Sequence, residues 1–283
     1  MCLIAFAIEA RPGLPLLLAA NRDEFFERPT AALHRWGTDG GVEVLAGRDL
    51  RDGGTWLGVS EAGRVAMLTN VRGPDAASGV RSRGELATRW LRGALDEAAM
   101  VSEIDPMAYA GFNLVVGDLH RGQWAWLSNC DPARPHAGPQ STLAQQTLDR
   151  GIYGLSNASL DTPWPKTLRL KAAMQTALQT SDLSSTSADS DPERHTLSAA
   201  LADATPAPAD RLPASGIDSA RERALSAAFV HLPDAGYGTR SSLVLKVQAQ
   251  GSQAPSVQAW EWTHLPNTPG WTTERPAYAT LAL

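Results

Sequence analysis

The chain carries a cysteine at position 2, directly behind the initiator methionine. Methionine aminopeptidases remove Met1 when the next side chain is small, so we expect a mature chain that begins with Cys2. Its free α-amine would titrate near ~7.7–8.0 and its thiol near ~8.5. The amine can therefore accept the proton of the thiol, and one residue would supply both nucleophile and base.

A thiolate formed in this way attacks an amide or thioester carbonyl, forms an acyl-enzyme, and is released when the same amine activates water. Cys2 therefore predicts acyl-transfer chemistry. The alternative is structural, because a free cysteine behaves as a small apolar residue and is often fully buried.

A polar cluster, Asn21-Arg22-Asp23-Glu24, follows the second apolar run of the chain. The Asp23 carboxylate would orient the ammonium form of the Cys2 amine, and the Arg22 guanidinium would favour the thiolate. Adjacent strand residues point to opposite faces, so Arg22 and Asp23 can both face Cys2 only if the regular strand ends near Asn21. Asn21 and Glu24 are candidates for substrate contacts. A capped turn with solvated charges is the alternative.

Five residues elsewhere in the chain are further candidates. Asn70 and Asn157 each stand where a strand-like run gives way to a loop, a suitable place for an oxyanion donor. Arg240 precedes a late strand. The alternatives are ordinary turns for the two asparagines and a solvated side chain for Arg240. Trp56 and Trp164 are candidates for an aromatic substrate pocket, although core packing is the commoner use of tryptophan.

Composition restricts the class of protein. With 283 residues, 43% of them hydrophobic and 19% charged, the chain can form a large core and lies outside the disordered regime. Its net charge of −5 gives no basic surface for nucleic acid. The apolar runs are too short to span a bilayer, and no signal peptide is evident.

Two cysteines, Cys2 and Cys130, and six dispersed histidines limit the metal and disulfide chemistry. Neither a disulfide framework nor a cysteine-based zinc site is expected, and no short-range histidine pair indicates a metal centre. We therefore predict a cytoplasmic protein without a resident cofactor.

Hydrophobic patterning predicts the elements that position these residues. Leu3–Ile8 and Leu14–Ala20 form a predicted β-hairpin, because the Pro and Gly between them favour a turn. Further strands are predicted at Val42–Ala46, Thr55–Val59, Val65–Asn70, Asn113–Gly117, Gln123–Leu127, Ile152–Ser156, Ser242–Val247 and Val257–Thr263.

Helices are predicted at Gly84–Met100, at Thr167–Gln179 and from near His195 to Leu201. Segments near residues 180–192 and 204–219 are rich in loop-forming residues and predict surface loops. With strands at both ends of the chain, the order predicts a single α+β domain over residues 1–283.

An ordered set of motifs resembles the NRDE-motif family, also called the transport and Golgi organisation family. The set consists of Cys2, Leu17-Leu18-Ala19-Ala20-Asn21-Arg22-Asp23-Glu24-Phe25, Arg28-Pro29, Ala46-Gly47-Arg48-Asp49, Gly53-Gly54-Thr55-Trp56-Leu57-Gly58, Leu68-Thr69-Asn70-Val71-Arg72, Gly111-Phe112-Asn113-Leu114, Tyr153-Gly154-Leu155-Ser156-Asn157 and Tyr237-Gly238-Thr239-Arg240-Ser241. These motifs extend from residue 1 to about residue 245.

That family is similar in turn to N-terminal nucleophile (Ntn) hydrolases, in particular to the penicillin V acylase and bile-salt hydrolase branch. The resemblance implies a four-layer αββα sandwich, in which two stacked, mainly antiparallel sheets lie between helical layers. In that branch the nucleophile is the cysteine after Met1, two Asn help to bind the oxyanion and a late Arg completes the site. Cys2, Asn70, Asn157 and Arg240 stand at corresponding places in the chain.

The first charged cluster departs from the pattern of the acylases. They keep two residues between an Arg and an Asp, whereas Arg22 and Asp23 are adjacent. The equivalent pair is therefore either Arg22 and Asp23 or Asn21 and Glu24.

The resemblance implies two functions of different class. The first is a cysteine hydrolase that acts on an amide or related acyl bond, with Cys2 as nucleophile and its own amine as base. The second is a non-catalytic protein of the same fold that binds and traffics haem or an acyl-CoA or lipid ligand. Haem would need an axial ligand, for which Cys2, His34 and His231 are candidates. The expected partner is a small-molecule amide, acyl or haem ligand, and not nucleic acid.

Overall fold

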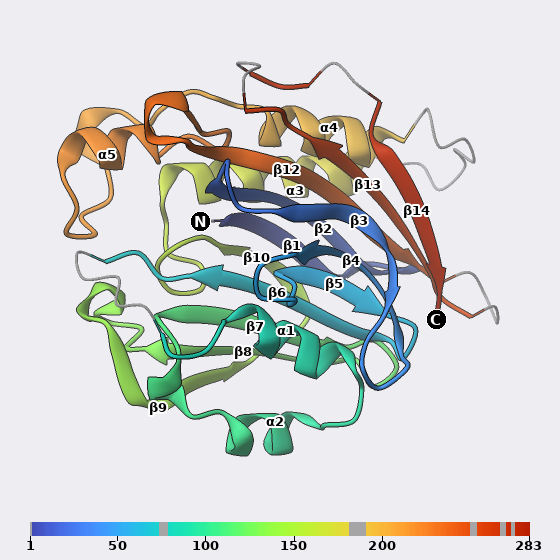
Figure 1. Ribbon diagram of the computed structural model, residues 1–283. Helices are drawn as coiled ribbons and strands as arrows, with labels where there is room; N and C mark the ends of the chain where they lie inside the picture. The colour runs from blue at the N-terminus through green and yellow to red at the C-terminus, as the bar shows by residue number, and fades with distance from the viewer. Residues whose placement is uncertain (1, 74–78, 181–190, 250–253, 267–269, 273–274) are drawn as a thin grey trace.

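The computed structural model describes residues 2–73, 79–180, 191–249, 254–266, 270–272 and 275–283. Two antiparallel β-sheets lie face to face, and helices cover their outer faces (Figure 1). No helix among the described residues is both long and apolar enough to cross a membrane.

The first sheet places the N-terminal hairpin beside late strands. Its strand order is β10-β1-β2-β12-β13-β14, and the short β11 (His231–Leu232) pairs with β12. The strands on this path are β10 (Gly151–Leu155), β1 (Cys2–Arg11), β2 (Leu14–Phe25), β12 (Tyr237–Gln248), β13 (Ser256–Thr263) and β14 (Ala277–Ala282). The two ends of the chain are therefore parts of one sheet.

The second sheet is a meander in which each strand pairs with the next one in the chain. Its strands are β3 (Thr30–Gly37), β4 (Glu43–Asp49), β5 (Leu57–Ser60), β6 (Arg64–Asn70), β7 (Phe112–Asp118), β8 (Gln123–Cys130) and β9 (Pro139–Thr147). Asn70, the last residue of β6, lies at the end of this sheet that holds the candidate site described below.

Strand alternation gives the first sheet two apolar faces. On β1, Ile4, Phe6 and Ile8 belong to the core between the sheets, whereas Leu3 and Ala5 belong to the core beneath the helices. A strand that is buried on both faces has a continuous apolar run as its sequence, and this is why the hairpin could be recognised from hydrophobic patterning alone.

Helices complete the four layers. The outer face of the first sheet packs against α3 (Pro165–Thr180) and α4 (Pro192–Leu201), and that of the second sheet packs against α1 (Gly84–Leu91) and α2 (Glu97–Glu103). A further helix, α5 (Ser219–Ala224), lies near the end of the sandwich where the N-terminus is found (Figure 1). The predicted α+β arrangement of two stacked antiparallel sheets between helical layers is confirmed.

Several elements differ from the prediction. The predicted helix Gly84–Met100 is two helices, because Gly93 adopts a left-handed φ of 75° after α1 and the Asp96 side chain caps α2. The third predicted helix begins at Pro192, three residues before His195. Within the loop expected near residues 180–192, residues 181–190 lie outside the described residues.

The sequence did not predict β3, β9, β14 or α5. The three strands expose much of their surface and lack an apolar run, because they lie at sheet edges. α5 has six residues, too few for a helical period to be recognised, and begins at the end of the loop expected at residues 204–219.

Candidate active site

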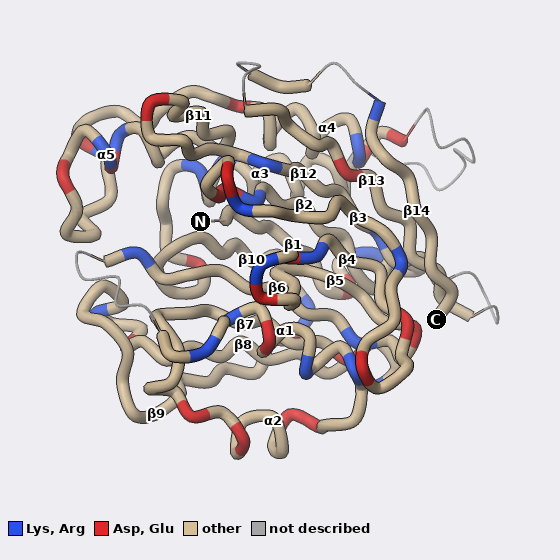
Figure 2. Tube along the Cα trace, viewed as in Figure 1, with Lys and Arg blue, Asp and Glu red and all other residues tan. Residues whose placement is uncertain are grey.

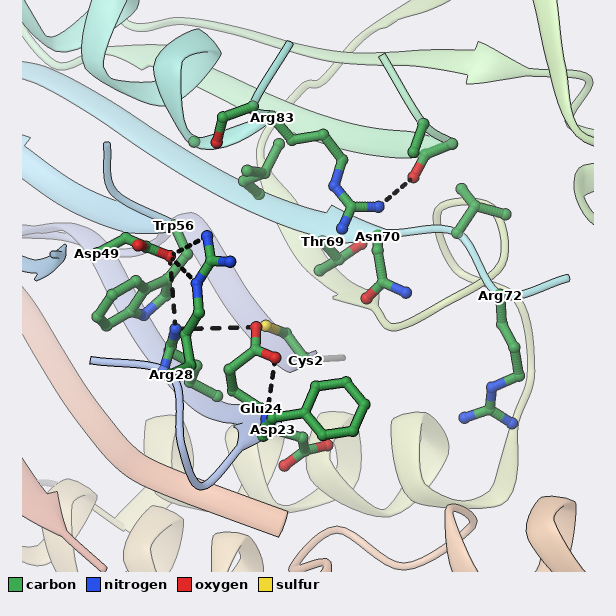
Figure 3. A pocket seen from close by; sticks show the side chains of 18 of the residues that line it. Cys2, Asp23, Glu24, Arg28, Asp49, Trp56, Thr69, Asn70, Arg72 and Arg83 are labelled. Atoms are coloured by element: carbon green, nitrogen blue, oxygen red, sulfur yellow. Dashed lines mark hydrogen bonds and ion pairs between the residues drawn. The ribbon is translucent and has the colours of Figure 1, made fainter. Parts of the chain in front are cut away.

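A cavity of about 680 Å³ opens at the end of the layer between the sheets (Figure 3). Its described lining includes Cys2 from β1, Arg22 and Glu24 from β2, Asn70 from β6 and Trp56 from the segment before β5. Tyr237 from β12 also lines the cavity, so the two sheets bring together residues that lie up to 235 positions apart in the sequence.

Cys2 lies opposite Arg22 in the antiparallel pairing of β1 with β2. The residue is 9% exposed, and its carbonyl accepts a hydrogen bond of 3.1 Å from the Ser156 hydroxyl. Burial raises the pKa of the Cys2 thiol, and the positive charges of the chain's N-terminus and of Arg22 oppose that rise. Cys2 is therefore accessible from the cavity but is not a thiolate near neutral pH.

Arg22 is a buried guanidinium with few partners. It is 5% exposed and stacks on the Trp56 ring at 4.2 Å. Its closest carboxylate oxygens, on Glu24 and Asp49, are 3.8 Å and 4.0 Å away, beyond hydrogen-bond distance. Among the described residues its Nη1 has no hydrogen-bond partner. Arg22 thus holds a positive charge beside Cys2 with donors still available.

Asp23 has its carboxylate on the other face of β2. Regular strand continues to Phe25, so the condition for Arg22 and Asp23 to share a face is not met. Asp23 accepts a 2.7 Å hydrogen bond from the Thr239 hydroxyl and points toward the helices (Figure 3). Burial raises the pKa of Asp23, and the nearby Lys166 ammonium opposes that rise.

Asn70 and Asn157 form a pair with different roles. The Asn157 amide nitrogen donates to the Asn70 backbone oxygen at 3.0 Å and to the Asn70 side-chain oxygen at 3.1 Å. Asn157 is fully buried, whereas Asn70 lines the cavity. Because the Asn70 oxygen accepts from Asn157, its amide nitrogen remains as the donor on the cavity side.

A buried polar network holds this pair in place. The Thr69 hydroxyl donates to the Ser156 carbonyl at 2.6 Å, and the Asn113 amide donates to Thr69 at 3.1 Å. The backbone N–H of Arg72 donates to the Asn157 carbonyl at 2.8 Å. These bonds fix the end of β6 against the segment after β10, and so fix Asn70 relative to β1.

Arg28 and two aspartates form the rim of the cavity. The Arg28 guanidinium contacts Asp49 at 2.8 Å and Asp52 at 2.6 Å. Hydrogen bonds from Arg28 and from backbone N–H groups lower the pKa of Asp49 despite its partial burial. The rim is therefore an ion-paired cluster that stays charged around neutral pH.

The sequence matches the family model described as Transport and Golgi organisation 2 over residues 1–263. The chain belongs to the Transport and Golgi organisation 2 family. The bovine Transport and Golgi organization protein 2 homolog is 34% identical, with 89% of this chain and 90% of that protein covered. The human homolog is 32% identical with the same coverage.

Solved structures with a partial likeness include two hydrolases. A variant of the conjugated bile acid hydrolase from Clostridium perfringens gives a TM-score of 0.42 at 10% identity, covering 99% of this chain and 92% of that one. The Caenorhabditis elegans ortholog of N-acylethanolamine-hydrolyzing acid amidase gives a TM-score of 0.41 at 11% identity, covering 70% and 86%.

Four of the predicted site residues lie outside the described lining of the cavity: Asn21, Asn157, Arg240 and Trp164. Asn21 is on the helix-facing side of β2, where its amide donates to the Leu201 and Ala228 carbonyls at 2.9 Å and 2.8 Å. Arg240 donates from Nη1 to the carbonyl of Phe25, the last residue of β2, at 2.9 Å and to that of Phe26 at 3.0 Å. Trp164 stacks beneath Arg72 at 4.8 Å.

The predicted residues that do line the cavity are Cys2, Arg22, Asp23, Glu24, Trp56 and Asn70. Asn157 contacts Asn70 directly and supports it from outside the lining. The structure therefore assembles most of the predicted set around Cys2.

Two buried or half-buried cations were not predicted. Lys166 is the second residue of α3, yet it is 2% exposed, donates to the Leu225 carbonyl at 3.0 Å, and has a pKa lowered to about 8 by burial. Arg83 precedes α1 and points into the cavity (Figure 3). A basic residue at a helix start is ordinarily solvated, so the sequence contains no signal that separates these two from surface residues.

The described residues contain no group of three or more His, Cys, Asp or Glu side chains that could hold a metal ion. Of the candidate haem ligands, His34 and His231 lie outside the described lining of the cavity, and Cys2 belongs to it.

Proposed function

We propose that this protein is a cysteine hydrolase that cleaves an amide or related acyl bond at Cys2. One observation supports this most directly: Cys2 and the under-partnered Arg22 face each other at the wall of a cavity to which Asn70 also contributes. Acyl transfer uses a nucleophile and an oxyanion donor, and a nearby positive charge favours the thiolate form of a cysteine nucleophile.

Removal of Met1 is the activating step in this mechanism. With Met1 in place the thiol has a raised pKa and no adjacent amine, because the Cys2 nitrogen is part of a peptide bond. Removal frees an amine that titrates near ~7.7–8.0 and can take the thiol proton. The positive charge of Arg22 then stabilises the thiolate.

The reaction proceeds in two acyl-transfer steps. The Cys2 sulfur attacks the carbonyl carbon, and the carbonyl oxygen becomes an oxyanion that accepts hydrogen bonds from Asn70 Nδ2. The Cys2 ammonium returns its proton to the leaving amine as the C–N bond breaks, which leaves a thioester. Water, deprotonated by the same amine, attacks the thioester and releases the acid and the thiol.

A second function, ligand binding without turnover, is favoured by the raised pKa of Cys2. If Met1 is retained, the cavity keeps its size and charge but lacks a base. For haem, Cys2 is the candidate axial ligand within the cavity. The test is a spectroscopic haem titration: a saturable Soret shift that is lost in Cys2→Ala supports this function, and an unchanged spectrum opposes it. Both functions suit a protein of the reducing cytoplasm, because both cysteines are free.

The hydrolase is tested by mass spectrometry of the native protein with N-octanoylglycine. We expect a chain that begins at Cys2, a thioester on the Cys2 peptide under acid quench, and release of glycine. Cys2→Ala should remove both signals and Cys130→Ala should keep them, because Cys130 is a buried residue outside the described lining of the cavity.

Two further results decide the mechanism. Protein that retains Met1 should be inactive until a methionine aminopeptidase removes it. Turnover by Cys2→Ala, or equal turnover with and without Met1, would refute the proposed function.

A further inference from the structure

The cavity has the opposite charge to the chain. The chain has a net charge of −5, whereas the described lining of the cavity holds seven arginines and four carboxylates. Acidic positions gather on parts of the surface such as α2, which has no basic residue in its last turn (Figure 2). Four of the seven arginines have a carboxylate within 4.0 Å: Arg22, Arg28, Arg72 and Arg81.

Arg83 differs from the other arginines in the cavity. Arg51 and Arg221 are exposed to solvent, whereas Arg83 is half-buried. Among the described residues, no carboxylate oxygen lies within ion-pair distance of its guanidinium. Its one hydrogen bond to a described residue, from Nη1 to the Gly111 carbonyl at 3.1 Å, fixes the direction of the head group. Within the part of the chain that the structure describes, four of its five N–H donors therefore have no partner and are open to a ligand.

The surroundings of Arg83 place it on the substrate side of the site. Its guanidinium points into the cavity that Cys2 and Asn70 also line (Figure 3). Burial lowers the pKa of Arg83, and the negative charge of Glu24, which lines the same cavity, opposes that fall. A guanidinium stays protonated in proteins, and a half-buried one without a counter-ion is stabilised by any anion that reaches it.

We propose that Arg83 binds a carboxylate or phosphate group of the ligand, so that the Cys2 site acts on anionic acyl compounds. The planar fork of donors matches the two oxygens of either group. This assignment rests on the proposed hydrolase function for the fate of the ligand, but binding of the anion does not require turnover. Arg83 is thus a specificity-determining residue.

The test compares three ligands with one acyl chain in the Cys2→Ala background, which excludes turnover. N-octanoylglycine carries a carboxylate, N-octanoyl-phosphoethanolamine carries a phosphate, and N-octanoylethanolamine is neutral. By titration calorimetry we expect at least one anionic compound to bind roughly 10- to 100-fold more tightly than the neutral one, the range of a charge-assisted hydrogen-bond pair. The better anion identifies which of the two groups the site prefers.

Variants at two arginines identify the source of that preference. Arg83→Gln should abolish it, and Arg83→Lys should retain part of it. Arg81→Gln is the matched control, because Arg81 lines the same cavity but pairs with Glu85 at 2.7 Å, and it should keep most of the preference. Thermal unfolding of each variant verifies that it is folded.

Equal binding of the three ligands, no saturable binding of either anion, or a preference that survives Arg83→Gln would overturn the assignment. A result that refutes the proposed hydrolase function can be distinguished from these outcomes. In that case N-octanoylglycine binds in an Arg83-dependent way, but the wild-type chain without Met1 forms no thioester and releases no glycine.

Discussion

The space between the two sheets has an apolar part and a polar end, and the same strands build both. On β1, Phe6 lies in the core and Cys2 lies in the cavity, on the same face of the strand. On β2, Leu18 and Arg22 are related in the same way. Strand alternation therefore selects the face, and the distance along the strand decides whether a residue contributes to folding or to chemistry.

Substitutions in the apolar part should lower the stability of the protein without removing a group that takes part in catalysis. Phe6 is fully buried and stacks on Tyr153 with ring centroids 5.4 Å apart. We expect Phe6→Ala to lower the free energy of unfolding by about 3–5 kcal/mol, because it leaves a cavity in a close-packed layer. Urea titration measures this.

Phe25 provides the control for that substitution, because it belongs to the polar end and is 48% exposed. Phe25→Ala should cost less than about 1 kcal/mol. If the two substitutions cost the same, the division between core and cavity is wrong.

Substitutions at the polar end should lower activity and change the stability of the protein little. Asn70→Ala removes the proposed oxyanion donor, and we expect kcat for N-octanoylglycine to fall by ~10²–10³ with little change in the unfolding midpoint. Asn157→Ala should reduce kcat by a smaller factor, because Asn157 acts through the orientation of Asn70. A larger loss in Asn157→Ala than in Asn70→Ala would reverse these roles.

Glu261 lies at the boundary between the apolar part and the polar end, and it makes the stability of the protein depend on pH. It is buried, accepts a 2.7 Å hydrogen bond from the Leu33 N–H of the opposite sheet, and has a pKa raised to about 7, mainly by burial. Since its folded-state pKa exceeds the unfolded value, its contribution to stability is fully present below about pH 4.5 and is lost as pH rises through about 7.

Glu261→Gln keeps the acceptor for Leu33 and removes the charge. The variant should match the wild type near pH 4.5 and exceed it by about 3 kcal/mol at pH 8, when both are compared by urea unfolding. A difference in stability that does not change with pH would show that Glu261 does not titrate in this range.

Much of the sandwich was predictable because its inner strands are apolar on both faces. β1, β2, β6 and β7 are evident as apolar runs, and the order of the motifs is enough to indicate the family without knowledge of tertiary contacts. β9 was missed because it is an edge strand whose sequence, Pro139–Thr147, is mainly polar. Hydrophobic periodicity in a sequence reports burial, and an edge strand buries few of its side chains.

The site was predictable only in part. Cys2 and Arg22 follow from their types and places in the chain. Asn21 faces the helices because β2 stays regular beyond it. Among the residues that the structure describes, no carboxylate lies beside Arg83, and this depends on how the second sheet packs there. These properties arise from tertiary contacts, which single positions do not encode.

The smallest expected effect concerns the thiol itself, and it sharpens the contrast between Cys2 and Cys130. Burial raises the pKa of Cys130 to about 11, and a backbone hydrogen bond from Phe112 opposes that rise. At Cys2, the positive charges of the N-terminus and of Arg22 oppose the effect of burial. Arg22→Gln should therefore raise the pKa of Cys2 further and slow its alkylation near neutral pH by up to about tenfold.

Alkylation across pH with a trace thiol reagent measures this, and the mass of the Cys2 peptide reports whether Met1 has been removed. Arg22→Lys retains the charge and should restore most of the reactivity, whereas the Cys130 peptide should stay unreactive in every variant. An Arg22→Gln protein with an unchanged Cys2 profile would mean that the cavity tunes this thiol through burial and the α-amine alone. In that case the guanidinium of Arg22 would serve to bind ligand rather than to activate the nucleophile.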